Sequence, residues 1–266
     1  MTTIIKIGGT LLDAVESRER LANEIAEAVE HGLEAVVVHG GGKQMTRYLA
    51  EHGIESQFVN GLRVTSPEVL DAVLRVLAGS VNQELVAAFT AAGARAVGLS
   101  GMDSLLTEAR RMSEELGWVG SPVKSDSKLL ELLIRNGYIP VVACVAGDAR
   151  GQFYNVNADQ MAASIAAAFP SERLMFLTDV DGVRGAENEI LPAVSAGDCR
   201  RLIESGVASG GMRAKLEAAS GALQAGVGEV VIAPGAQVGV IQRLLRGDGI
   251  GTRLVSEVEV SKHGMH

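Results

Sequence analysis

The sequence predicts an α/β fold in which a mostly parallel sheet is covered by helices on both faces. Short apolar runs rich in Val and Ile alternate with helical runs along the chain, as in repeated strand–helix–strand units. The composition is 47% hydrophobic but only 3% aromatic, which suits aliphatic helices packed on a buried sheet. At 266 residues the chain can form one large domain or two closely joined lobes.

The strands are predicted from short β-branched runs, and the first of them, 3–7, ends in Gly8-Gly9. Two short runs, 105–109 and 117–123, are predicted to form a hairpin. Further strands are expected at 35–38, 95–99, 139–145, 173–178 and 230–233.

The helices are predicted from apolar residues at helical spacing, as in 14–30. Pro67 stands at the start of one helical run, where its fixed φ suits the first turn. No linker rich in Gly, Ser or Pro divides the chain, and the residues from about 257 are expected to form a frayed tail. The other helices are expected at 44–51, 67–77, 82–92, 127–135, 158–168, 196–204, 212–225 and 238–245.

Charge and composition exclude several classes of partner. A net charge of −8 gives no general attraction to nucleic acid or to an anionic membrane. The scarcity of aromatic residues argues against a binder that stacks nucleic-acid bases. Cys144 and Cys199 lack metal or redox spacing and are interpreted as small core residues of a reducing compartment. No signal peptide and no apolar run of membrane-spanning length is expected, which predicts a soluble cytoplasmic protein.

The loop after the second predicted strand, VVVHGGGKQM at 36–45, indicates an anion site. It is not a nucleotide P-loop, because Lys43 is followed by Gln44 rather than Ser or Thr and no glycine stands at position 37. Glycines 40–42 can still present backbone N–H groups beside a helix N-terminus, where phosphate or carboxylate binds. The alternative is a tight turn without a ligand. His39 is interpreted as a packed histidine that steers the loop.

Other loops at predicted strand ends carry single charged or polar groups. Lys6, at the end of an apolar strand, is costly to bury without an anion. Arg63 in NGLRVT has the planar fork that suits a carboxylate, although a lone surface arginine is the alternative. In NVNAD at 155–159, Asn157 can also be a simple helix cap. Lys215 stands in the first turn of a helix opened by a glycine pair.

Once metal sites and nucleophile arrangements are set aside, the side chains at the strand ends favour phosphoryl transfer. The pair Asp179 and Asp181 is too short for a calcium loop, and no histidine has metal-ligand spacing. No Ser/His/Asp or Cys/His arrangement stands out as a nucleophile. Two placed lysines beside glycine-rich loops suit a reaction that needs mainly positioning and charge neutralisation.

Ten motifs, collinear over nearly the whole chain, resemble those of the amino acid kinase family, in particular its members that phosphorylate N-acetyl-L-glutamate. NGLRVT and NVNADQ are far more specific than the glycine runs. The motifs are KIGG (6–9), VHGGG (38–42), NGLRVT (60–65), AVGLSG (96–101), LGWVG (116–120), NGYIPVV (136–142), NVNADQMA (155–162), LTDVDGV (177–183), GGMRAKLEAA (210–219) and GTRL (251–254).

The resemblance implies a three-layer αβα sandwich with two lobes. An N-terminal lobe, 1–170, would bind the acyl-amino acid and form the dimer, and a C-terminal lobe, 171–256, would bind ATP. A disordered tail would follow at 257–266. The implied reaction is ATP-dependent phosphorylation of the γ-carboxylate of N-acetyl-L-glutamate, a step of arginine biosynthesis.

The resemblance also implies roles for individual residues. Lys6 and Lys215 would flank the transferring phosphoryl group, and Asp159 would orient both lysines. Mg²⁺ would be held by the phosphates of ATP and by water, with no protein ligand. The substrate-binding residues would be Gly41, Gly42, Arg63 and Asn155. The nucleotide-binding residues would be Gly8, Gly9, Thr178, Asp179, Val180, Gly182, Val183, Val207, Ser209, Gly210 and Gly211.

Two positions depart from the pattern or lie outside it. Arg184 stands where the family usually has an apolar residue in the nucleotide loop, which could alter nucleotide affinity without changing the reaction class. Lys43 matches no functional position and is assigned to the helix surface.

The oligomer implied by the resemblance is a homodimer. Relatives that arginine inhibits carry an extra helix before the first strand, which joins dimers into a hexameric ring. Only five residues precede Lys6, too few for a helix of useful length, so we expect a dimer that arginine does not inhibit.

Two alternative functions are also compatible with the predicted fold. A kinase of the same family could act on aminoadipate or glutamate attached to a carrier protein, which would demand a basic docking surface. The segment EELGWVG at 114–120 favours the acetylglutamate type instead. A non-catalytic amino-acid sensor would be indicated by loss of Lys6, Lys215 or Asp159, and all three are present.

Overall fold

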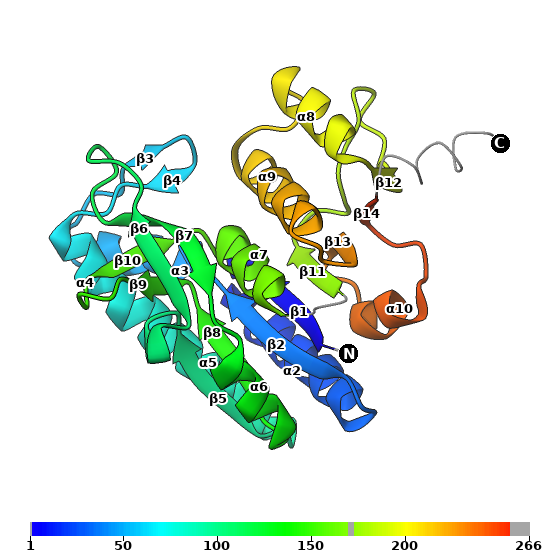
Figure 1. The fold of residues 1–266 in the computed structure, drawn as a ribbon, viewed down its shortest axis with the longest axis horizontal. Coiled ribbons are helices and arrows are strands. Elements are labelled where there is room, and N and C mark those ends of the chain that lie inside the picture. The colour runs from blue at the N-terminus through cyan, green and yellow to red at the C-terminus, as the bar shows by residue number, and fades with distance from the viewer. Residues whose placement is uncertain (1, 170–172, 256–266) are drawn as a thin grey trace.

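The computed structural model describes residues 2–169 and 173–255, and the predicted tail lies outside them. Figure 1 shows a central sheet with helices on both of its faces, as the sequence predicts. The sheet has eight strands in the order β12-β14-β13-β11-β1-β2-β8-β5. Their bounds are β1 Thr2–Ile7, β2 Glu34–His39, β5 Ala96–Ser100, β8 Ile139–Ala143, β11 Arg173–Thr178, β12 Ala193–Val194, β13 Glu229–Pro234 and β14 Thr252–Leu254.

Six of these strands run parallel to their neighbours, from β13 through β11, β1, β2 and β8 to β5. Only the pairing of β13 with β14 is antiparallel. The carboxyl ends of the parallel strands therefore meet at one edge of the sheet, where α/β proteins bind their ligands. Gly8, Gly40, Cys144, Asp179 and Gly235 follow those strand ends directly.

The helices form the two outer layers. One layer contains α1 Gly9–Asp13, α2 Val15–Glu30, α3 Gly42–Glu51, α5 Asn82–Ala91 and α10 Val240–Arg246, with α4 Pro67–Arg75 packed on α3. The other contains α6 Lys128–Arg135, α7 Ala158–Ala168 and α9 Gly210–Gln224, with α8 Ala196–Glu204 packed on α9. Figure 1 shows α7 in front of the middle of the sheet. This arrangement is the expected three-layer sandwich.

A second, four-stranded sheet closes on itself beside the main one, in the order β10-β7-β6-β9. The predicted hairpin is confirmed within it, because β6 Thr107–Arg111 and β7 Val119–Ser125 pair antiparallel. Sequence reasoning missed β10 Phe153–Val156 and read β9 Val145–Gly147 as the end of the preceding strand. A short hairpin of β3 Phe58–Val59 and β4 Leu62–Arg63 was also read only as a turn.

The helical run after Pro67 was predicted to break between 77 and 82, and this is wrong. The chain stays helical from Pro67 to Ala91, with a π-helical turn at Val76–Val81. A π turn absorbs Gly79 and Ser80 without ending the helix. Contrary to expectation, this helix is long and apolar enough to cross a membrane by length and composition alone. Half of its most apolar window is buried inside the protein, as in a core helix.

Candidate active site

The centre of the site is a carboxylate held between two ammonium groups. Lys6 Nζ lies 2.8 Å from Asp159 Oδ1, and Lys215 Nζ donates to Asp159 Oδ2 at 2.9 Å. Lys6 is on β1, and Asp159 is in the first turn of α7. Lys215 lies in the second turn of α9 rather than in the first as predicted, because the helix already begins at Gly210. All three side chains are buried, each with less than a tenth of its surface exposed. The group carries a net positive charge, because two cations surround one anion.

The pKa values of Asp159 and Lys215 depend on the burial of each side chain and on the neighbouring charges. Burial alone would raise the pKa of Asp159, but the two ammonium groups hold that pKa below its ordinary value. Burial lowers the pKa of Lys215 to about 8, Lys6 adds to the effect, and Asp159 opposes it. Lys215 therefore stays mostly protonated at neutral pH but close to its titration point.

Two glycine loops meet next to the lysines. Gly8 N–H donates to Leu177 O at 2.9 Å, which ties the end of β1 to the end of β11. A Cβ at Gly9 would lie only 3.0 Å from Gly42 N and 3.2 Å from Gly41 Cα. Glycine is required at this position because the two loops approach backbone to backbone.

A cavity of about 240 Å³ opens beside Lys6. It is lined by four predicted substrate-binding residues together with apolar side chains from α3, α4 and the π turn. The lining residues are Lys6, Gly9, Gly40, Gly41, Gly42, Met45, Phe58, Gly61, Leu62, Arg63, Val73, Leu77, Val119, Cys144, Asn155, Val156, Asn157 and Ala158. The volume is that of a small ligand, and two cations, Lys6 and Arg63, are among the lining residues.

Arg63 is one of those cations. Its side chain is buried, and burial lowers its pKa. The guanidinium donates only to neutral oxygens: Ser56 Oγ, Thr46 Oγ1 at 2.8 Å and Gly42 O at 3.2 Å. Within the part of the chain that the structure describes, Arg63 forms no ion pair with a carboxylate. A buried guanidinium in this position can recognise an anionic ligand in the cavity.

Asn155 reaches the cavity from β10, where its Nδ2 donates to Thr65 Oγ1 at 3.0 Å. Thr65 is fully buried and was not singled out from the sequence. Asn157 is the N-cap of α7, because its side chain accepts from the N–H groups of Asp159 and Gln160. The capping interpretation of Asn157 is therefore confirmed, and the cap fixes the turn that carries Asp159.

The predicted nucleotide side is built from exposed loops. Thr178 is buried at the end of β11, while the following Val180 is exposed. Val207, Ser209, Gly210 and Gly211 are exposed before and at the start of α9. A Cβ at Gly61, on the tip of the β3–β4 hairpin, would lie 3.9 Å from the carbonyl carbon of Gly210. The tip of the hairpin therefore lies close to the start of α9.

The far end of the 178–184 loop is anchored rather than free. Val183 is fully buried, and its N–H donates to Thr252 Oγ1 at 2.8 Å. Gly182 approaches the same hydroxyl so closely that a Cβ would lie 2.7 Å from it. Arg184 is exposed and donates to Asn188 O and Asn188 Oδ1, both at 3.1 Å. The guanidinium of Arg184 thus closes its own loop.

The predicted burial of His39 and of both cysteines is confirmed, as is the surface position of Lys43. His39 is fully buried, and burial lowers its pKa to about 4, so the ring is neutral. Its Nδ1 lies 3.0 Å from Gly40 O, and its Nε2 lies 3.0 Å from Asn82 Nδ2. Lys43 is exposed on α3. Both cysteines are buried, and burial raises the pKa of Cys144 to about 12.

Sequence reasoning missed the residues that hold Arg63. Besides Ser56 and Thr46, the ring of Phe58 lies under the guanidinium, 4.6 Å from the ring centroid to Cζ. Phe58 and Arg63 are directly opposite each other in the β3–β4 hairpin. The only sequence signal was the Asn-Gly turn at 60–61, a strong marker of a hairpin.

Among the described residues there is no group of three or more His, Cys, Asp or Glu side chains placed to hold a metal ion. Asp159, the carboxylate nearest the cavity, is already paired with two lysines.

Comparisons with known proteins agree with this geometry. The model of the amino acid kinase family matches residues 1–234. An acetylglutamate kinase of Solibacter usitatus is 59% identical over 256 residues, which cover 96% of this chain and 100% of the relative. An acetylglutamate kinase of Koribacter versatilis is 41% identical over 261 residues, covering 97% and 100% of the two chains.

Solved structures show the same fold. N-acetylglutamate synthase from Neisseria gonorrhoeae, complexed with coenzyme A and N-acetyl-glutamate, superposes with a TM-score of 0.85 at 28% identity. The match covers 96% of this chain and 59% of that one. Carbamate kinase from Giardia lamblia bound to AMP-PNP gives a TM-score of 0.70 at 18% identity, covering 96% and 98%.

Proposed function

The chain belongs to the amino acid kinase family, and from this premise we infer that it phosphorylates N-acetyl-L-glutamate with ATP. The γ-carboxylate of the acceptor becomes the acyl phosphate N-acetyl-L-glutamyl 5-phosphate, an intermediate of arginine biosynthesis. The observation that carries this function is the buried Lys6–Asp159–Lys215 group, whose Lys6 lines a cavity of about 240 Å³.

The cavity is proposed as the acceptor site. Arg63 would grip the α-carboxylate of the acceptor with its planar fork, because it is buried there with only neutral partners. Gly41 and Gly42 would approach the acyl-amino acid through their backbone, and Asn155 would complete the wall that faces it. This orientation directs the γ-carboxylate toward Lys6, at the other side of the cavity.

The reaction then needs charge neutralisation rather than proton removal. A glutamate γ-carboxylate has an ordinary pKa of about 4.3, so it is ionised at neutral pH and needs no general base. A carboxylate oxygen bonds to the γ-phosphorus while the bond from that phosphorus to the β,γ-bridging oxygen breaks, and ADP leaves. Lys6 and Lys215 would offset the repulsion between the two anions and the charge on the phosphoryl oxygens. Asp159 would hold both ammonium groups in place.

The nucleotide is proposed to lie across the exposed loops at 178–183 and 207–211, with its phosphates toward Gly8 and Gly9. The N–H groups at the start of α9 suit a phosphate, and Lys215 in the same helix adds a charge. Mg²⁺ would arrive as the counter-ion of ATP. We assign it no protein ligand, since the described residues contain no cluster placed for one.

The division of labour between two lobes, 1–170 for the acceptor and 171–256 for ATP, is part of the same proposal. The strand order supports it, because β1 separates the β2, β8 and β5 strands from β11, β13 and β14. We further propose a cytoplasmic homodimer, since closed two-fold dimers are the commonest homo-oligomers. Light scattering measures the mass and tests the dimer directly.

The function is tested by MgATP-dependent turnover with N-acetyl-L-glutamate, trapping the acyl phosphate as a hydroxamate and counting ADP in parallel. We expect both products in equal amounts. Turnover only with a carrier-linked aminoadipate or glutamate would reassign the acceptor. Binding of N-acetyl-L-glutamate without ADP formation would indicate a sensor.

A further inference from the structure

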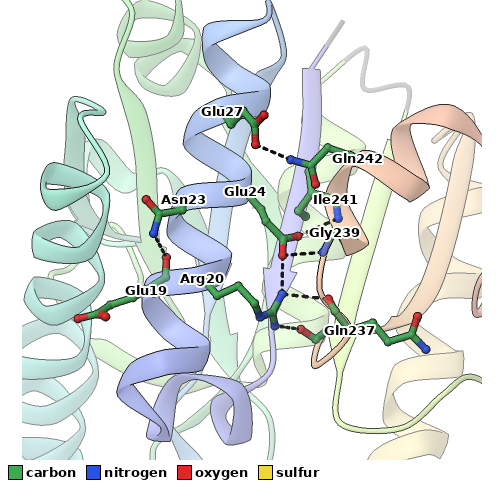
Figure 2. A network of polar contacts seen from close by, with 10 residues as sticks. Glu19, Arg20, Asn23, Glu24, Glu27, Gln237, Gly239, Ile241 and Gln242 are labelled. Atoms are coloured by element: carbon green, nitrogen blue, oxygen red, sulfur yellow. Dashed lines mark hydrogen bonds and ion pairs between the residues drawn. The ribbon is translucent and has the colours of Figure 1, made fainter.

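A polar network ties helix α2 to the segment between β13 and α10, far from the acceptor cavity. Figure 2 shows its centre, where Arg20 and Glu24 lie one turn apart on α2. Arg20 Nη1 donates to Glu24 Oε1 at 2.7 Å. The carboxylate of Glu24 is buried, and it also accepts from Gly239 N–H at 2.9 Å and from Ile241 N–H at 3.2 Å. Three donors therefore converge on one buried carboxylate.

The guanidinium of Arg20 binds the same segment through its carbonyls. Nη1 donates to Gln237 O at 3.0 Å, and Nη2 donates to Gly235 O. The Arg20–Glu24 ion pair thus binds segment 235–241 through two backbone carbonyls and two backbone N–H groups. Bonds to charged groups are among the stronger hydrogen bonds in proteins, so this segment is fixed firmly to α2.

The held segment continues into the nucleotide side of the site. Gly235 N–H donates to Thr178 O at 2.8 Å, at the residue where the 178–184 loop begins. Gly235 also packs against Leu11 of α1, so closely that a Cβ would lie 2.3 Å from Leu11 Cδ1. Helix α1 begins at Gly9, which lines the cavity together with Lys6. The segment therefore touches both the loop at Thr178 and the helix that carries the glycine loop.

We propose that Arg20 and Glu24 are positioning residues for nucleotide binding. By fixing Gly235, they fix the position of the loop that begins at Thr178 relative to Gly8 and Gly9. The proposal rests on the proposed function, which puts ATP at these loops. Neither residue lines the acceptor cavity. Their effect should therefore fall on the nucleotide and spare the acceptor.

The test compares Glu24→Gln and Arg20→Lys with the unaltered enzyme. Glutamine keeps the shape of the side chain but turns one acceptor into a donor that faces N–H groups. Lysine keeps the charge but cannot reach two carbonyls and a carboxylate at once. We expect each variant to raise the KM for ATP, and the Kd for MgADP in calorimetry, by about tenfold. The KM for N-acetyl-L-glutamate should change by less than about twofold.

A matched control lies at the amino ends of β11 and β13, the two strands that lead to Thr178 and Gly235. Arg173 at the start of β11 pairs with Glu229 at the start of β13, with 2.5 Å between Nε and Oε2. This pair is partly buried and joins the same strands, but at their amino ends. Glu229→Gln should lower the melting temperature and leave the KM for ATP unchanged.

The outcomes separate the two proposals. If the unaltered enzyme makes no hydroxamate and binds no MgADP, the proposed function fails. If it is active and the α2 variants lose thermal stability while keeping a normal KM for ATP, or raise both KM values equally, the positioning role is wrong. Arg20→Lys preserves the buried charge balance, so it decides the question should Glu24→Gln fail to fold.

Discussion

The acceptor side and the nucleotide side of the site are built in different ways. On the acceptor side the cavity is lined by buried Arg63 and by Asn155, which donates to the buried Thr65 behind it. On the nucleotide side Val180 and Val207 are exposed, and a Cβ at Gly211 would meet nothing within 4 Å. In the proposed function, preformed side chains would therefore bind the acceptor, whereas backbone N–H groups would bind the phosphates. Substitutions on the two sides should therefore have separable kinetic effects, except at the lysines where the sides meet.

The largest expected effect is at that meeting point. Lys215→Ala should lower kcat by roughly 10² to 10³, the usual cost of removing one electrostatic stabiliser of a transition state. Because Lys215 is proposed to act on the transferring group, the KM values of both substrates should change less than kcat. Steady-state kinetics with Lys43→Ala as the control, an exposed lysine on α3, gives the comparison. Near-normal turnover in Lys215→Ala would remove this residue from the transition state.

A smaller effect, confined to the acceptor side, is expected for Arg63→Lys. Lysine keeps the charge but loses the fork, so transition-state binding should weaken by about 1–3 kcal/mol, seen as a higher KM for N-acetyl-L-glutamate. The KM for ATP should hardly move. Arg47→Lys is the matched control, because Arg47 is exposed on the same helix that Arg63 contacts and forms only a surface ion pair with Asp13. Equal shifts for both substrates would contradict the separation of the two sides.

The pH dependence of kcat/KM for ATP tests whether Lys215 acts in its charged form. Its pKa is lowered from 10.5 to about 8, mainly by burial, and the charged form is the one that stabilises phosphate. As pH rises through about 8 the proton is lost, so kcat/KM for ATP should fall roughly tenfold per unit above that value. A pH profile of Lys215→Arg should lose this limb, since arginine stays charged. An unchanged limb in Lys215→Arg would assign the titration to another group.

The smallest expected effect tests whether the two sides are coupled by contact. Gly61 has φ 80° at the hairpin tip that touches Gly210, and Gly61→Ala should cost about 1 kcal/mol of unfolding free energy. Gly93→Ala, at φ 81° in a turn with open space around it, should cost the same. Chemical denaturation measures both. Because Gly61 also lines the cavity, a loss confined to the KM for N-acetyl-L-glutamate would place the effect there. A rise beyond about twofold in the KM values of both substrates, absent from Gly93→Ala, would show that the hairpin tip and α9 act together.

Local pattern was enough to predict most of this fold. The buried strands and long helices were placed to within a few residues, because each has a hydrophobic period of its own. The strands that were missed, β3, β4, β10, β12 and β14, have four residues or fewer, and the pairing of β12 with β14 joins segments distant in sequence. The π turn was missed for a related reason: packing kept the helix continuous through Gly79 and Ser80, against their local preference.

The site was less accessible from sequence than the fold. A charged residue beside glycines indicated an anion, but Asp159 lies far from Lys6 and Lys215 along the chain, and only the fold brings them together. The neutral partners of Arg63 had no signal of their own, because serine and threonine are common at surfaces. The Arg20–Glu24 pair is spaced like any surface ion pair on a helix, and its burial against segment 235–241 is visible only in three dimensions.

The position of β1 has a consequence for how the protein is made. This strand is synthesised well before one of its two neighbours, β11, with which Thr3 pairs at Arg173. While the ribosome is still adding the chain between them, β1 and β2 can pair but the other edge of β1 has no partner. An unpaired apolar edge of this kind favours aggregation, and pairing over so long a separation is slow. A chain truncated after Phe169 should therefore precipitate or stay bound to chaperones, and a soluble, monomeric fragment would show that the first half folds without β11.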